Sequence, residues 1–230
     1  MQEDGLGFWQ AAITILRKDF RAEFRTKEVF NSAVVFALIV IVVFSMAFDP
    51  STRQAQEMSG GLLWIAFAFS AVLALGRTFA REVPNDALLG LQMAPIPPAA
   101  VYAGKLLSNL AFLGLLELLL LPLFGVFYNL RLGEVAAPLV LIVALGSWGL
   151  AAVGTTFAAI ATSVRLREMM LPVLLFPVEI PLILSLVEAT TAVLRDNSLA
   201  GAWIWLQICI GFDVIFTILS LFLFEYVLGE

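Results

Sequence analysis

The sequence contains no histidine and only one cysteine, and these scarcities exclude several kinds of site. Without histidine, no Ser–His or Cys–His pair can activate a nucleophile, and the usual nitrogen ligand of metal centres is missing. The lone Cys209 lies within the last apolar segment. It can form no disulfide within the chain and no thiolate cluster for zinc or iron. We therefore expect no catalytic residues, no metal site and no cofactor bound by this chain.

A nucleotide-binding P-loop is also missing. That loop needs the pattern G-x-x-x-x-G-K-[ST], because its backbone N–H groups and its lysine hold the phosphates. The one Gly-Lys pair is Gly104-Lys105, and Leu106 follows it. The chain is therefore predicted not to be an enzyme, and any ATP hydrolysis linked to it is expected in another polypeptide.

Charged residues are few, at 13%, whereas 61% of the 230 residues are hydrophobic. The apolar residues form six continuous segments, at 32–48, 61–76, 106–127, 136–162, 169–188 and 203–224. Each has about the length that a helix needs to cross a bilayer, and none alternates as the strands of a barrel would. The sequence predicts an all-α polytopic membrane protein in which residues 1–230 form a single transmembrane domain. Because its charge is not pooled on one face, we expect no nucleic-acid partner.

Positive charge is distributed unequally between the two sides of these six spans. Counting from the N-terminus, the first side receives Arg17, Lys18, Arg21, Arg25, Lys27, Arg77, Arg81, Lys105, Arg165 and Arg167, and the second receives Arg53, Arg131 and Arg195. Since lysine and arginine concentrate in cytoplasmic loops, both termini are predicted to be cytoplasmic.

Residues 8–28 precede the first span and have the pattern of an amphipathic helix. Its large apolar residues recur at helical spacing, at Trp9, Ile13, Leu16, Phe20 and Phe24. The cations lie largely off this stripe, which is typical of a helix in the membrane interface, in contact with lipid. A helix packed on a partner subunit is the alternative.

The stretch 77–105 is the longest between two spans and is predicted to lie in the cytoplasm. Asn85 or Asp86 is suited to cap a short helix over 87–93, and three prolines at 95, 97 and 98 end it. Leucines at 88, 89 and 91 give this helix an apolar surface, although it is too short to span. Such a helix fits a groove in another protein. Two alternatives are that it lies on the lipid surface or packs beneath its own bundle.

These features together resemble the heme exporter protein B family, the B subunit of the cytochrome c maturation system. The resemblance covers essentially the whole chain and is carried by FAREVPNDALLGLQMAPIPPAAVYAGK, by Val164-Arg165-Leu166-Arg167 and by LPVLLFPVEIPL in the fifth span. The chain differs from the family pattern in one place. The family's loop is closer to an acidic pair followed by Gly-Ser-Leu-Glu, where this sequence has Glu82, Asp86 and the run Ala87–Gly90.

The resemblance implies an ABC-2-type permease-like subunit in the bacterial cytoplasmic (inner) membrane. Its partners would be an ABC ATPase (the A subunit), the C and D membrane subunits and a periplasmic heme chaperone. Heme and ATP would then be handled by the complex, whereas this chain would couple ATP hydrolysis to conformational change. The coupling helix would bind the ATPase through Asp86, Leu88, Leu89, Leu91 and Gln92, with Arg81, Glu82 and Arg165 at the rim of the contact.

Three acids lie near the middle of predicted spans: Glu117, Glu179 and Asp213. Intramembrane acids are costly and usually face the bundle interior or a wet cavity. They are consistent either with a proton or cation relay or with neutral carboxyls hydrogen-bonded to neighbouring helices. Pro172, Pro177 and Pro181 are predicted to bend or break the fifth span, most simply by kinking it.

The fourth span carries a stripe of small residues at helical spacing: Ser147, Ala151, Gly154, Ala158 and Ala161. Such a stripe predicts close packing against another helix, either of this chain or of a second copy.

Three other functions stay open from the sequence. One is an ABC-2-type exporter of polysaccharide or drug, and another is a proton-coupled carrier that uses the three intramembrane acids. The third is a passive scaffold for assembly.

Overall fold

The computed structural model describes residues 7–48, 52–79, 82, 90–91, 93–130, 133, 135–163 and 167–229. Within these ranges the chain is helical and contains no strand. The helices are α1 (Phe8–Thr26), α2 (Glu28–Ala47), α3 (Arg53–Leu75), α5 (Pro98–Phe127), α6 (Ala136–Ile160), α7 (Arg167–Asp196) and α8 (Trp203–Gly229). Two short 3-10 turns, η3 (Ala161–Ser163) and η4 (Ala200–Ala202), follow α6 and precede α8.

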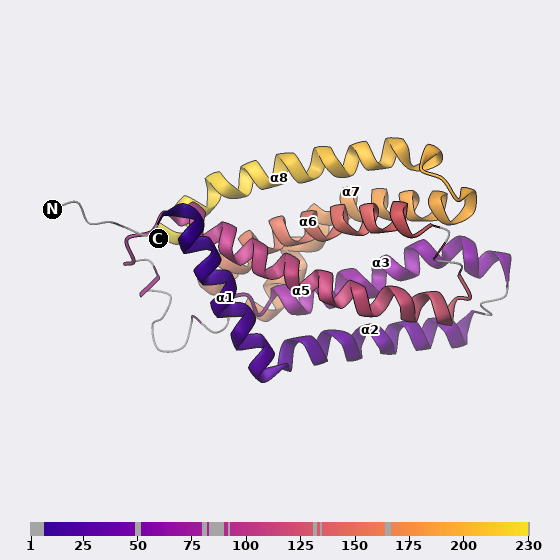
Figure 1. Cartoon of the computed structure of the whole chain (residues 1–230), viewed down its shortest axis with the longest axis horizontal. Helices are drawn as coiled ribbons and strands as arrows, with labels where there is room; N and C mark the ends of the chain where they lie inside the picture. Colours follow the sequence, from indigo (N-terminus) through magenta and orange to yellow (C-terminus); the bar gives the residue numbers. More distant parts are fainter. Residues whose placement is uncertain are drawn as a thin grey trace.

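Six of these helices, α2, α3, α5, α6, α7 and α8, are long and apolar enough to cross a membrane. They run side by side as one bundle, and α1 crosses one end of it (Figure 1). The C-terminal end of α8 lies at that same end, while the α7–α8 turn lies at the other (Figure 1). The predicted fold class of a polytopic helical membrane protein is confirmed, and the cytoplasmic position of the termini stays a prediction.

Helix α6 is the centre of the bundle. It packs against α3, α5, α7 and α8, and it buries residues along almost its whole length, from Leu139 to Ala159. The small-residue stripe is buried at each position: Ser147, Ala151, Gly154, Ala158 and Ala161. Small side chains allow helix backbones to approach closely, which is the main source of helix association where lipid supplies no hydrophobic drive. The stripe therefore packs against spans of this same chain.

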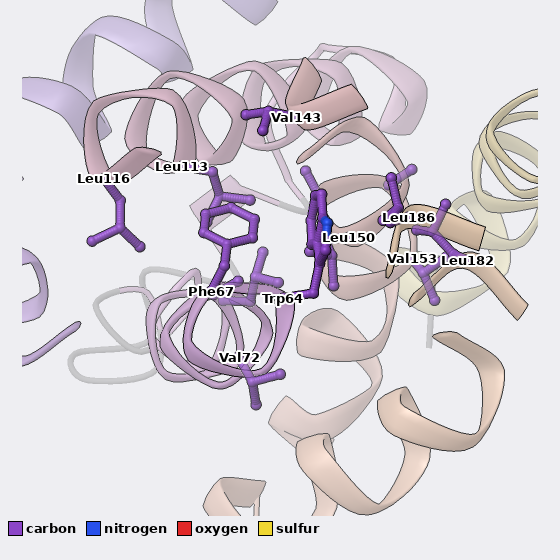
Figure 2. Close-up of a cluster of buried hydrophobic side chains, with 14 of the residues drawn as sticks. Trp64, Phe67, Val72, Leu113, Leu116, Val143, Leu150, Val153, Leu182 and Leu186 are labelled. Carbon is purple, nitrogen blue, oxygen red and sulfur yellow. The ribbon is translucent and has the colours of Figure 1, made fainter. Parts of the chain in front are cut away.

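The core beside α6 is built from large apolar side chains of several helices. Figure 2 shows Trp64 and Phe67 of α3, Leu113 of α5, Leu150 of α6 and Leu186 of α7 converging in one cluster. Trp64 is 1% exposed, and its Nε1 donates a hydrogen bond to Thr190 Oγ1 of α7 at 2.9 Å. A buried indole N–H needs an acceptor, so this bond fixes how α3 and α7 are aligned.

The three prolines of α7 do not break it. The helix is continuous from Arg167 to Asp196 through Pro172, Pro177 and Pro181, and it extends beyond the predicted span at 188. Prolines are tolerated in membrane helices when side chains and neighbouring helices compensate for the missing N–H groups.

Helix α1 joins α2 through a single residue, Lys27, whose φ of 55° is in the left-handed region. Its N–H donates to the carbonyl of Glu23 at 2.6 Å, which ends α1. Glu23 Oε1 then accepts hydrogen bonds from the N–H groups of Val29 and Phe30 at 3.1 and 3.0 Å. One glutamate therefore satisfies two of the N–H groups that the first turn of α2 leaves unpaired.

Candidate coupling site at the α1 end of the bundle

Helix α1 lies against α5. The face that it buries is not the predicted apolar stripe of Trp9, Ile13, Leu16, Phe20 and Phe24. Ala11, Ala12 and Ile15 are buried, whereas Trp9 and Phe24 are 66% and 53% exposed. A helix with its large apolar side chains on the outside of the protein is suited to contact lipid with that face. Packing of α1 against its own bundle was in neither prediction from the sequence, because two of its three buried residues are alanines, which carry little hydrophobic signal.

Gly104 of α5 makes this close contact possible. An ideal Cβ at this position would lie 2.8 Å from the Ala12 carbonyl oxygen and 2.8 Å from the Ile15 Cβ. Such distances are too short for real contacts, so the absence of a side chain allows α1 to lie directly on α5. The next residue, Lys105, then reaches the polar side of α1.

Lys105 is the centre of a buried ion cluster that we define as Lys18, Asp19, Glu82 and Lys105. The side chain of Lys105 is 1% exposed. Its Nζ lies 2.9 Å from Asp19 Oδ2 of α1 and 2.6 Å from Glu82 Oε1, in the segment that follows α3. It also donates to the carbonyl of Thr78 at 2.8 Å and lies 4.8 Å from the ring centre of Phe79. One ammonium group therefore joins three parts of the chain.

Lys18 supplies the second cation of the ion cluster. Its Nζ lies 2.5 Å from Glu82 Oε1 and 3.2 Å from Asp19 Oδ1, and its side chain is 52% exposed. Burial alone would raise the pKa of the Glu82 carboxyl, but the charges and hydrogen bonds of Lys105 and Lys18 outweigh it and hold that pKa below its ordinary value. Burial likewise opposes the charge on Lys18, yet Asp19 and Glu82 raise its pKa. Glu82 and Lys18 are therefore both charged at neutral pH.

A polar cavity of about 170 Å³ adjoins the ion cluster. Asp19, Arg77, Glu82 and Asn109 are among the residues that line it. Asn109 accepts a hydrogen bond from Thr78 Oγ1 at 3.1 Å and donates one to Thr155 Oγ1 of α6 at 2.8 Å. Hydrogen bonds therefore continue from the segment after α3, across α5, to the central helix.

The predicted loop 77–105 is shorter in the structure, because α5 begins at Pro98 with Pro97 as its N-cap. Proline is favoured in the first turn of a helix, where its missing N–H would have no partner anyway. The prolines that were predicted to end a short helix therefore also begin α5. As a result Lys105, counted from the sequence among the loop cations, lies inside the helix. An isolated lysine in an apolar helix was the available signal, but its partners are distant in sequence.

Two of the predicted ATPase-binding residues fall in the part of the chain that the structure describes. Glu82, predicted at the rim of that contact, is 4% exposed and bound within the ion cluster. Leu91, predicted as a docking residue, is helical and half-buried against the hydrophobic core. The other predicted residues lie outside the described ranges: Arg81, Asp86, Leu88, Leu89, Gln92 and Arg165. The docking contact and its rim stay predictions.

The three intramembrane acids are all buried, but they occupy two different places. Glu117 of α5 accepts a hydrogen bond from Ser147 Oγ of α6. Glu179 of α7 and Asp213 of α8 are close enough to interact electrostatically. None of their four carboxyl oxygens has a hydrogen-bond partner among the described residues. The structure therefore places Glu117 in a helix contact and leaves the other pair without donors from the described chain.

Comparison with known proteins gives one consistent result. The family model described as "CcmB protein" matches residues 10–228. The "Heme exporter protein B" of Pseudomonas aeruginosa is 28% identical over 192 residues, which are 84% of this chain and 86% of that protein. Proteins of the same name from Rhodobacter capsulatus and Paracoccus denitrificans are 30% and 29% identical, over 73% and 76% of this chain and 76% and 80% of their own lengths.

Proposed function

This chain belongs to the CcmB family, and on that basis we propose that it is the membrane-spanning subunit of an ABC transporter complex for cytochrome c maturation. It is a multi-pass protein of the bacterial inner membrane, and its relatives carry the name heme exporter protein B. The chain couples ATP hydrolysis by a separate ATPase subunit to movement of its spans. The C and D subunits and a periplasmic heme chaperone complete the assembly, which handles heme and releases the loaded chaperone.

The ATPase docks on the segment between α3 and α5, through Asp86, Leu88, Leu89, Leu91 and Gln92, with Arg81 and Arg165 at the rim. The observation that carries this proposal is the ion cluster. Glu82 and Thr78, both in the segment that leads from α3 to the docking residues, bind Lys105 of α5, and Lys105 binds Asp19 of α1. A displacement of the docked segment is therefore transmitted to α1 and α5 through short ionic contacts.

The experiment compares copurification of the ATPase subunit with the wild-type chain and with a Leu88→Asp/Leu89→Asp double variant. Leu91 is left unchanged because it contacts the core, so its replacement would also disturb folding. We expect the double variant to lose ATPase binding, since two charges would enter an apolar contact. The control is Leu199→Asp/Trp203→Asp at the opposite end of the bundle, where both side chains are exposed, and it should retain ATPase binding.

The result is interpretable only if the double variant still forms the bundle, which its thermal melt in detergent reports. Wild-type levels of ATPase binding in a folded double variant would contradict the docking proposal. Loss of binding combined with unchanged cytochrome c maturation would instead contradict the coupling role.

A further inference from the structure

Asp213 is a buried acid that the coupling proposal does not use. It lies in the middle of α8, is 6% exposed, and neither Oδ1 nor Oδ2 accepts a hydrogen bond from any residue in the described ranges. A carboxyl group in this environment has lost its hydration, and no hydrogen bond from the described residues replaces it. Such groups in membrane spans normally pair with a side chain that can donate.

No residue in the described part of the bundle donates a hydrogen bond to Asp213. An ideal Cβ on Gly149 of α6 would lie 2.7 Å from Asp213 Oδ1, so the carboxyl rests against the α6 backbone. The side chain of Leu182 of α7 also lies against the α6 backbone at Gly149. The neighbouring acid, Glu179, is fully buried and also lacks hydrogen-bond partners among the described residues. The two acids therefore do not satisfy each other.

Asp213 does, however, line a groove that opens on the outside of the bundle. The groove has a volume of about 520 Å³ and lies between α6 and α8. Its walls are apolar and include Leu141 on α6, with Val214 and Ile218 on α8, which are 44%, 53% and 51% exposed. Asp213 is the acidic residue among the described residues that line it, and its carboxyl oxygens lie just beneath the groove surface.

Trp148 and Thr217 join the two sides of this groove. Trp148 Nε1 of α6 donates a hydrogen bond to Thr217 Oγ1 of α8 at 2.9 Å, and both residues line the groove. The bond holds α6 and α8 together beside the acid, so the groove has fixed walls rather than being a gap between loosely packed helices.

We propose that the α6–α8 groove binds a transmembrane helix of another membrane subunit, and that this helix presents a basic side chain to Asp213. A helix supplies apolar surface for the walls and a cation for the acid, whereas a lipid acyl chain supplies only the first. Pairing of opposite charges is the usual way in which an intramembrane acid is stabilised. This inference rests on the proposed complex with other membrane subunits, but the site lies in the spans and its test is independent of ATPase docking.

A second copy of this chain does not match the chemistry of the groove. Apart from Lys105, nine of its 13 cations belong near one end of the predicted spans and three near the other. Lys105, which lies within a span, is already bound to Asp19 and Glu82. Charge complementarity therefore points to a different chain with a lysine, arginine or histidine near the middle of a span.

The test uses photo-crosslinking in native membranes that contain the complete complex. A photoreactive amino acid replaces Ile218 in the groove or, as a matched control, Ile39 on the exposed face of α2. We expect the photoreactive residue at position 218 to cross-link to a span of another membrane subunit. The cross-linked residue should lie within about one helical turn of a basic residue, because side chains one turn apart are neighbours on a helix. Ile39 should not give this product. Peptide mapping by mass spectrometry identifies the cross-linked segment.

Two variants then test the role of the acid and of the groove. Asp213→Asn removes the charge, and Val214→Trp fills the groove while leaving Asp213 in place. Each is expected to lower the yield of the cross-link from Ile218 by about tenfold, because a buried cation is left unpaired or the helix is excluded. Ile39→Trp should leave the yield unchanged. Val214→Trp keeps the test valid if Asp213→Asn does not fold.

The proposal is overturned by any of three results. These are cross-links from Ile218 only to lipid or to a second copy of this chain, cross-links to a span without a basic residue nearby, and an unchanged yield in a folded Asp213→Asn variant.

Discussion

Two lysines of the ion cluster bind the same carboxylates but differ in their contact with water. Lys105 is 1% exposed and Lys18 is 52% exposed. Removing one member of a buried ion pair leaves an uncompensated charge in a medium of low dielectric, whereas an exposed member is replaced by water. The two residues therefore form a natural matched pair for measuring how much the cluster contributes.

We expect Lys105→Met to lower the free energy of unfolding by about 3–5 kcal/mol, the range for breaking a buried ion pair. Lys18→Met should cost about 1 kcal/mol or less, as for a solvent-exposed pair. Thermal or denaturant unfolding of the two variants in the same detergent measures the difference. Equal effects of the two substitutions would show that burial of Lys105 does not determine the strength of the cluster.

At the level of residues, the sequence predicted positions better than partners. The three acids were located within spans, but nothing in the sequence indicated that Glu117 would bind Ser147 of α6. Glu82 was predicted at the rim of a contact with the ATPase, and its pairing with Lys105 depends on how α3, α5 and α1 meet. Such partners are set by the packing of distant segments, which local spacing does not encode.

At the level of elements, the contact between α1 and α5 depends on the size of one side chain. Gly104 has no space for a Cβ because Ala12 and Ile15 of α1 lie directly above it. Gly114, on the same helix, has nothing within 4 Å of an ideal Cβ. Gly104 and Gly114 therefore separate the effect of crowding from the effect of helix propensity.

Gly104→Ala is expected to push α1 away from α5 and to weaken the ion cluster, at a cost of about 1–3 kcal/mol, as for overpacking of a core. Gly114→Ala should be neutral or stabilise the helix by up to about 1 kcal/mol. Hydrogen exchange of the α1 amides reports the displacement directly. Equal protection of α1 in both variants would mean that the close approach at Gly104 is not needed.

Helix α1 also shows why amphipathic patterns give an incomplete description. Its aromatic stripe correctly predicted a helix, but the face that packs on α5 consists of Ala11, Ala12 and Ile15. In a water-soluble protein the larger apolar side chains would be buried. Where lipid covers the outside, small side chains are favoured at helix contacts instead. The most hydrophobic face of such a helix therefore marks its contact with lipid and not its contact with the neighbouring helix.

At the level of the whole molecule, six spans place both ends of the chain on one side, as Figure 1 shows for α1 and the end of α8. Which side this is follows only from the distribution of positive charge. We expect a green fluorescent protein fused to the C-terminus to be fluorescent. Alkaline phosphatase inserted after Asn197, between α7 and α8, should be active. The reverse pattern would place the docking segment outside the cytoplasm and remove the basis for ATPase coupling.

The number and order of the spans could be predicted from the sequence because crossing a bilayer requires long apolar helices. Their ends were predicted less well, since α5 begins at Pro98 and α7 continues to Asp196. Hydrophobicity reports the part of a helix inside the hydrocarbon, whereas caps and contacts with other helices decide where it ends. The small residues of α6 predicted close packing against another helix, but not its central position or its neighbours.

The one-residue joint at Lys27 has a mechanical consequence. Glu23 near the end of α1 accepts hydrogen bonds from the N–H groups of Val29 and Phe30 in α2, so the two helices are also connected across Lys27. The first span, which packs on α3 and α5, buries the smallest share of its residues among the six, so the least packing within the chain opposes its displacement.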